Sequence, residues 1–125
     1  KKNMSYSDDN IFAKILRKEI PCEKVYEDDH CLAFKDINPQ AKIHVLVVPK
    51  GKYISFDDFS QNASGEEISS FFKAVGKIAK DLDLSTEGYR ILSNIGKLGG
   101  QEVPHFHIHI FGKQYLGPML SKNLG

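Results

Sequence analysis

The sequence predicts an α+β domain, in which one antiparallel sheet of about five strands carries one short and one long helix on its apolar side. Strict alternation of polar and apolar residues over 105–110 has the period of a β-strand, and apolar residues over 68–82 recur at helical spacing. The 125 residues, 41% of them hydrophobic, suit one domain with its own core. We expect residues 1–9 to be flexible and residues 10–125 to form the domain.

Cap and turn residues predict the first elements. Asp-Asp-Asn at 8–10 offers N-cap side chains for a short amphipathic helix over 11–18. β-forming residues at 24–27 and 31–35 flank Asp-Asp-His at 28–30, a pattern typical of a hairpin.

The two cysteines predict free thiols, as is usual in a reducing compartment. In the expected hairpin Cys31 faces Tyr26, and Cys22 lies well away from that position, so a disulfide would distort the backbone.

The remaining segments complete the predicted sheet and add a long helix. Residues 43–48 are apolar and β-branched, which favours a central strand. Ser64 and Glu67 form a capping box before the long helix. Residues 89–93 predict another strand, and the glycine-rich loop at 94–100 leads to the last one.

Composition excludes several classes of partner. Seventeen basic and sixteen acidic residues give a net charge of +1, so no overall field attracts nucleic acid or an anionic membrane. The sequence shows neither a hydrophobic signal core nor an apolar run long enough to cross a bilayer. We therefore expect a cytoplasmic protein.

The segment 105–111 holds three of the five histidines. Alternate side chains of a strand point to opposite faces, so these histidines share one face and the apolar residues between them share the other. The histidines are His105, His107 and His109, and the apolar residues are Phe106, Ile108 and Ile110. One face is therefore available for chemistry while the other joins the core.

Two kinds of site are compatible with the histidine face. Histidines at i and i+2 can bind zinc, but His105 and His109 would lie roughly 13 Å apart along a strand. The sequence has no Cys-x-x-Cys pair or His-Glu-x-x-His helix to supply further ligands. Alternatively, a central imidazole can attack phosphorus while its neighbours bind phosphate charge and move protons.

Three other features have both a structural and a functional interpretation. His44 in its apolar strand can be a hydrogen-bonded core residue or a catalyst. Asp36, in Asp-Ile-Asn-Pro, can stabilise a turn or bind a ligand. The loop at 94–100 can be a connector, or its glycines can let backbone amides approach a phosphate.

The segment 105–111 resembles the His-φ-His-φ-His-φ-φ signature of the histidine triad superfamily of nucleotide hydrolases and transferases. Residues 10–21, 34–41, 44–49 and 99–105 are similar to its Hint branch, and the resemblance covers nearly the whole chain.

The resemblance implies an enzyme that cleaves the P–N bond of AMP or GMP phosphoramidates, and of related acyl-adenylates, without a metal or other cofactor. It implies that His107 is the nucleophile, with His105, His109 and His44 binding phosphate oxygens and relaying protons. The residues implied to bind the nucleotide are Ile11, Phe12, Phe34, Asp36, Ile37, Asn94, Gly100, Gln101 and Glu102. Glu102 departs from the Ser or Thr of many members, whose hydroxyl contact an anionic carboxylate cannot make.

The resemblance also implies a homodimer, with the C-terminal tail of one subunit near the site of the other. The expected partners are thus a purine nucleotide and a second copy of the chain. The alternatives are a dimeric nucleotide-binding or sensor module without turnover, a dinucleoside polyphosphate hydrolase, and a zinc protein.

Overall fold

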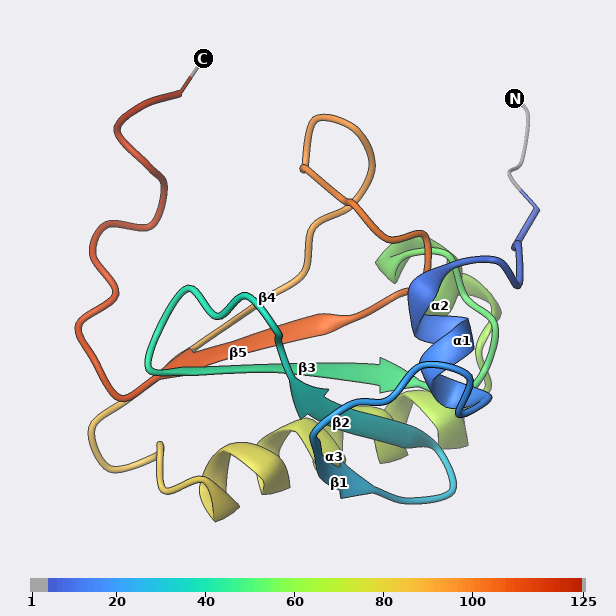
Figure 1. Ribbon diagram of the computed structural model, residues 1–125, viewed down its shortest axis with the longest axis horizontal. Coiled ribbons are helices and arrows are strands. Elements are labelled where there is room, and N and C mark those ends of the chain that lie inside the picture. The colour runs from blue at the N-terminus through green and yellow to red at the C-terminus, as the bar shows by residue number, and fades with distance from the viewer. Residues whose placement is uncertain (1–4, 125) are drawn as a thin grey trace.

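The computed structural model describes residues 5–124, which form three helices and five strands (Figure 1). The helices are α1 (Ile11–Leu16), α2 (Phe56–Asn62) and α3 (Gly65–Asp81). The strands are β1 (Lys24–Glu27), β2 (Cys31–Lys35), β3 (Ile43–Pro49), β4 (Arg90–Leu92) and β5 (Ile108–Gly112). Neighbouring strands are antiparallel in the order β1-β2-β3-β5-β4. The α+β class and the five-stranded antiparallel sheet are confirmed.

The helix starts follow from the predicted caps. Asn10 Oδ1 accepts a hydrogen bond of 2.9 Å from the backbone N–H of Ala13 at the start of α1. At the start of α3, the side chain of Ser64 accepts from the N–H of Glu67, and the Glu67 carboxylate accepts from the N–H of Ser64. These reciprocal bonds are the predicted capping box.

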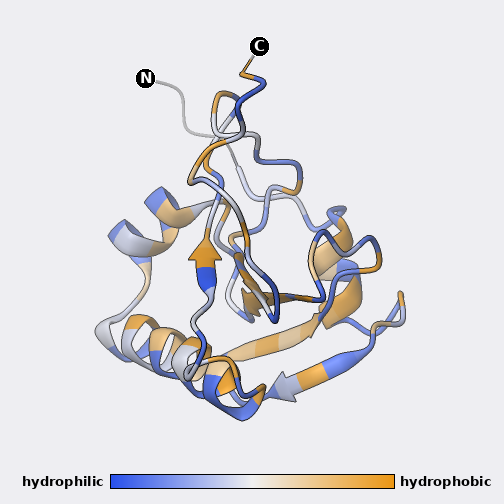
Figure 2. Ribbon diagram, turned by 90° about the vertical axis from the view of Figure 1, so that its left-hand side faces the viewer, coloured by the Kyte–Doolittle hydropathy of each residue, from blue (hydrophilic) through white to orange (hydrophobic). Residues whose placement is uncertain are grey.

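Helices cover both faces of the sheet, which corrects the expectation that both lie on one apolar side (Figure 1). One face packs against α2 and α3 through Cys31, Ala33, Val45, Val47, Ile108 and Ile110 with Phe59, Phe71, Val75 and Ile78. The other packs against α1 through Leu32, Phe34, Leu46 and Val48 with Phe12 and Ile15. In Figure 2, hydrophobic and hydrophilic residues alternate around the long helix α3, as expected of a helix that buries one side. The strands β2 and β3 place apolar residues on both faces, which matches a helix layer on each side of the sheet.

The helix α2 was not predicted from the sequence. It has seven residues, and of these only Phe59 is buried. The centroid of the Phe59 ring lies 4.7 Å from that of Phe106 and 5.2 Å from that of Phe71. A single buried residue gives no helical period, so this helix depends on contacts made in the folded domain.

The hairpin forms as predicted, but its register differs. Glu27 pairs with Leu32 and Tyr26 with Ala33, so Cys31 does not face Tyr26. The Asp28 carboxylate accepts from the backbone N–H of Cys31, the first residue of β2, and so closes the turn before this strand. Both cysteines are free, and burial raises the pKa of the Cys31 thiol to about 12.

The two ends of the described chain differ. Residues 1–4 of the segment expected to be flexible lie outside the description, whereas Tyr6 and Asp8 are tied to the domain through His105 and Lys52. The C-terminal tail leads away from the sheet in both ribbon views, and Tyr115 is 90% exposed (Figures 1 and 2). Among residues 5–124, no helix is long and apolar enough to span a bilayer.

Candidate active site

A cavity of about 380 Å³ lies beside α1 and contains most of the predicted site. The predicted residues that line it are Ile11, Phe12, Phe34, Asp36, Ile37, Asn94, Gly100, Glu102, His107 and His109. Three predicted residues lie outside the lining: His44, His105 and Gln101. A larger hollow of about 580 Å³ lies between the α3–β4 connection and the start of the tail, and no histidine lines it. Of these two cavities, only the smaller one is lined by histidines of the predicted site.

Strand register explains which imidazoles gather on the α1 side. Leu46 of β3 pairs with His109 of β5, and His44 pairs with Phe111. Paired residues of antiparallel strands share a face, so His44 and His109 lie on the face of Leu46, diagonally across the two strands. The predicted alternation is confirmed, because Phe106 and its apolar partners join the α3 side.

A hydrogen bond determines which nitrogen of the His107 ring carries the proton. Its Nδ1 lies 2.8 Å from the carbonyl oxygen of His105, and a carbonyl only accepts, so Nδ1 carries the hydrogen. The neutral ring keeps its lone pair on Nε2. Phe12 meets the His107 ring edge-on at 4.8 Å between centroids, and Ser93 Oγ donates to the His107 carbonyl at 2.7 Å. These contacts hold a neutral imidazole with a free nucleophilic nitrogen in the cavity wall.

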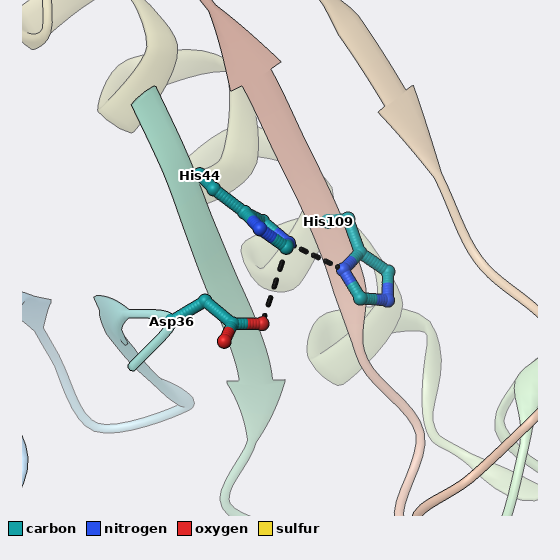
Figure 3. A group of neighbouring side chains, drawn as sticks. All are labelled: Asp36, His44 and His109. Atoms are coloured by element: carbon teal, nitrogen blue, oxygen red, sulfur yellow. Dashed lines mark hydrogen bonds and ion pairs between the residues drawn. The ribbon is translucent and has the colours of Figure 1, made fainter. Parts of the chain in front are cut away.

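A second chain of hydrogen bonds fixes the proton of His109 (Figure 3). The backbone N–H of Gln40 donates to Nδ1 of His44 at 3.1 Å, so neutral His44 carries its hydrogen on Nε2. That hydrogen is donated to Nδ1 of His109 at 2.9 Å, and Asp36 Oδ2 lies 3.4 Å from the same His44 nitrogen. His109 is left with an N–H on Nε2. The site therefore pairs a lone pair on His107 with an N–H on His109.

The hydrogen bonds of His44 also bear on the zinc hypothesis. Ligand atoms of Asp36, His44 and His109 lie within 4.8 Å of one another, close enough to share one ion. A metal would need the lone pair of His44 Nε2, which carries a hydrogen. Moving that hydrogen to Nδ1 would point it at the N–H of Gln40. These residues do not fit a metal.

His105 is placed differently from the expectation. Its side chain is fully buried, its Nε2 donates to the carbonyl of Pro49 at 2.8 Å, and its Nδ1 lies 2.6 Å from the hydroxyl of Tyr6. Both ring nitrogens of His105 therefore have protein partners and the ring does not line the cavity, so its predicted contact with phosphate oxygens stays a prediction. The reason for this placement is that β5 starts only at Ile108, because the N–H of His105 bonds to the carbonyl of Val103 in a turn.

Gln101 also supports the site from outside. Its amide donates to the carbonyl of Ile54 at 2.7 Å and accepts from the N–H of Gly96 at 3.1 Å. The loop between β4 and β5 is thereby closed on itself. Gly100, which lines the cavity, has a φ of +78°, a conformation that favours glycine.

Burial keeps the histidines neutral. Desolvation lowers the pKa of His105 and of His109 to about 4, and lowers the pKa of His44 and His107 as well. For His107, the charges of Asp36 and Glu102 oppose this effect without reversing it. At neutral pH the cavity therefore presents uncharged imidazoles whose protons are placed by hydrogen bonds.

Acid is expected to destabilise the fold between about pH 6.5 and pH 4. His105 and His109 have a pKa of 6.5 when unperturbed and about 4 when folded, so the unfolded chain binds more protons in this window. The free energy of unfolding thus rises with pH there: the contribution is complete above about pH 6.5 and is lost toward pH 4. Urea midpoints should fall steadily between about pH 7 and pH 5. A constant midpoint would contradict buried neutral histidines.

Several residues of the site carried no signal in the sequence. Gln40 and Pro49 act through backbone groups, which every sequence position offers. Leu46 and Val103 add apolar walls to the cavity, and their types are those of any core residue. Tyr6 lies 99 positions from the ring it contacts.

Comparison with known proteins decides the family. The HIT domain family model matches residues 17–116. The chain belongs to the HIT family. An uncharacterised HIT-like protein of Azospirillum brasilense is 55% identical over 118 residues, covering 94% of this chain and 97% of that one. The purine nucleoside phosphoramidase of Escherichia coli is 39% identical over 115 residues, covering 92% and 96%.

Solved HIT structures share the fold. A HIT family hydrolase from Clostridium thermocellum superposes with a TM-score of 0.83 at 35% identity, over 92% of this chain and 99% of that one. A histidine triad protein from Clostridium difficile gives 0.80 at 43% identity, over 91% and 98%. The family and these relatives support a hydrolase related to nucleotide-cleaving enzymes.

Proposed function

We propose that this HIT protein hydrolyses the P–N bond of purine nucleoside 5′-monophosphoramidates through a nucleotidyl-histidine intermediate. The observation that carries the proposal is the pairing of a lone pair on His107 Nε2 with an N–H on His109 Nε2 in one cavity. The relation to the Escherichia coli enzyme supports the substrate class.

In the first step His107 Nε2 attacks the α-phosphorus, a new N–P bond forms, and the bond from phosphorus to the leaving amine breaks. The amine takes its proton from water. The His105 carbonyl, bonded to Nδ1–H of His107, stabilises the positive imidazole ring of the intermediate. Water then hydrolyses the new bond, which releases the nucleoside monophosphate and restores neutral His107.

The His109 N–H acts as a hydrogen-bond donor to the leaving nitrogen. Neutral imidazole is a very weak acid, and Nδ1 of His109 already accepts the hydrogen bond from Nε2–H of His44. We therefore propose that His109 donates a hydrogen bond rather than transfers a proton. Preorganised donors of this kind stabilise charge that develops in the transition state.

The cavity lining also supports a place for each part of the nucleotide. In the proposed pose Ile11, Phe12 and Ile37 hold the base, with Phe34 behind them, and Asp36 binds the ribose hydroxyls. Asn94, Gly100 and Glu102 line the same cavity as His107 and His109 and would hold the phosphate and the leaving group. Glu102 is exposed, and its carboxylate suits a cationic leaving amine better than a second phosphate.

Turnover of adenosine 5′-phosphoramidate by the purified protein tests the proposal, with AMP release measured in the presence and absence of a chelator. We expect release that the chelator does not change. Binding of AMP without release would favour the non-catalytic nucleotide-binding module, and cleavage of dinucleoside polyphosphate alone would favour that hydrolase class.

Replacing Asp36 with Asn should weaken AMP binding by about tenfold to a hundredfold, because a hydrogen bond to a charged group is lost. The Asn38 N–H donates to Asp36 Oδ1 at 2.8 Å, and Asn can keep that turn. Calorimetry with AMP and with 2′,3′-dideoxy-AMP provides the measurement. The wild type should prefer AMP and the variant should bind both alike; an unchanged preference would exclude Asp36 as the ribose ligand.

We also propose that the protein works as a homodimer. The strand β4 lies at the edge of the sheet with Ile91 46% exposed, and the tail exposes Tyr115, Met119 and Leu120. Sedimentation at micromolar concentration should give about twice the 14.1 kDa mass of one chain. A monomer would contradict this part of the proposal.

A further inference from the structure

The hydroxyl of Tyr6, in the segment before α1, contacts His105 from outside the cavity. Tyr6 Oη lies 2.6 Å from Nδ1 of His105, and the two rings meet edge-on with centroids 5.5 Å apart. The segment is itself anchored, since Asn10 donates to the carbonyl of Ser7 at 2.8 Å. The contact therefore joins an ordered stretch before α1 to the stretch before β5.

The two ring nitrogens of His105 have partners that define their roles. The carbonyl of Pro49 can only accept, so Nε2 of His105 carries the hydrogen in that 2.8 Å bond. The lone pair is then on Nδ1, and the Tyr6 hydroxyl donates to it. A turn of the His105 ring would break both bonds in a fully buried position.

The backbone of the same residue supports the nucleophile. The carbonyl of His105 accepts the Nδ1–H of His107 and thereby leaves the Nε2 lone pair free. Phe12 contacts both rings, at 6.3 Å from His105 and 4.8 Å from His107 between centroids. A displacement of His105 would move both the acceptor and the packing of His107.

We propose that Tyr6 is a positioning residue for attack by His107: its hydroxyl holds the ring of His105, and this residue in turn holds the carbonyl that fixes the proton of His107. The segment before α1 thus belongs to the active centre, although it lies outside the nucleotide cavity. The kinetic part of this inference rests on the proposed function, whereas the placement of the protons does not.

The test compares Tyr6→Phe with Tyr26→Phe. Both variants lose one hydroxyl hydrogen bond, since Tyr26 donates to Asp28 at 2.9 Å on the β1–β2 hairpin. We expect Tyr6→Phe to lower kcat by about threefold to tenfold, the value of one hydrogen bond, with KM within a factor of about two. Nitrogen NMR should show the Nδ1 signal of His105 moving toward that of an unbonded lone pair and the His107 Nδ1–H signal shifting. Tyr26→Phe should change neither.

Other results would overturn the inference. An unchanged kcat in Tyr6→Phe with unchanged ring signals would show that the hydroxyl positions nothing. An equal loss of rate in both variants, or a loss with unaltered His105 and His107 signals, would assign the effect to general stability. If the wild type does not cleave phosphoramidates, the proposed function fails, and the ring signals of His105 and His107 alone decide the positioning role.

Discussion

Replacing His107 with alanine is expected to lower the rate of phosphoramidate cleavage by at least about a thousandfold, because the nitrogen proposed to attack phosphorus is removed. The ring is buried but lines the cavity, and its loss leaves the His105 carbonyl without a donor. Single-turnover release of AMP measures the effect. The affinity for AMP should change much less, since the pocket walls and Asp36 remain.

The matched control is His30→Ala. This histidine lies in the β1–β2 turn, 3.5 Å from the carboxylate of Glu66 and away from the cavity. It should retain wild-type turnover. If His107→Ala kept more than about a tenth of the wild-type rate, another group would have to be the nucleophile.

The second largest effect is expected at His109. Alanine there should lower the rate by about a hundredfold, the usual loss for one transition-state hydrogen-bond donor. Glutamine offers an amide N–H but cannot transfer a proton, so His109→Gln should retain about tenfold more activity than His109→Ala. Steady-state kinetics on both variants provides the measurement.

The comparison also separates two roles. Equal losses in His109→Gln and His109→Ala would indicate proton transfer and contradict the hydrogen positions inferred from Gln40 and His44. Urea midpoints of both variants serve as the control, because a fold defect would lower activity without any catalytic meaning.

Much of the fold could be predicted because its elements carry local signals. Capping residues located the starts of α1 and α3, and β-forming runs located β1, β2 and β3. The arrangement of the helices could not be read in this way. Apart from His44, residues 43–48 are apolar on both faces, and such a strand does not reveal whether one or two layers cover it. The short helix α2 has too few buried residues to show a period.

The candidate site, like the fold, could be predicted from the sequence only in part. The alternation of the histidines predicted that His107 and His109 lie on one side, and most of the residues named from the family resemblance line the same cavity. The proton positions depend on backbone partners at Gln40, Pro49 and His105, and backbone groups leave no trace in the side-chain pattern. Tyr6 is distant in sequence from every histidine of the cluster, so only the folded chain shows their contact.

The proposed nucleotidyl-histidine is tested most directly by mass spectrometry of the wild-type protein quenched in alkali during turnover of adenosine 5′-phosphoramidate. We expect a fraction of the protein to carry one added AMP moiety through a P–N bond, located on His107, with His105 and His109 unmodified. Full turnover with no such adduct, or an adduct on a different residue, would contradict nucleophilic catalysis by His107.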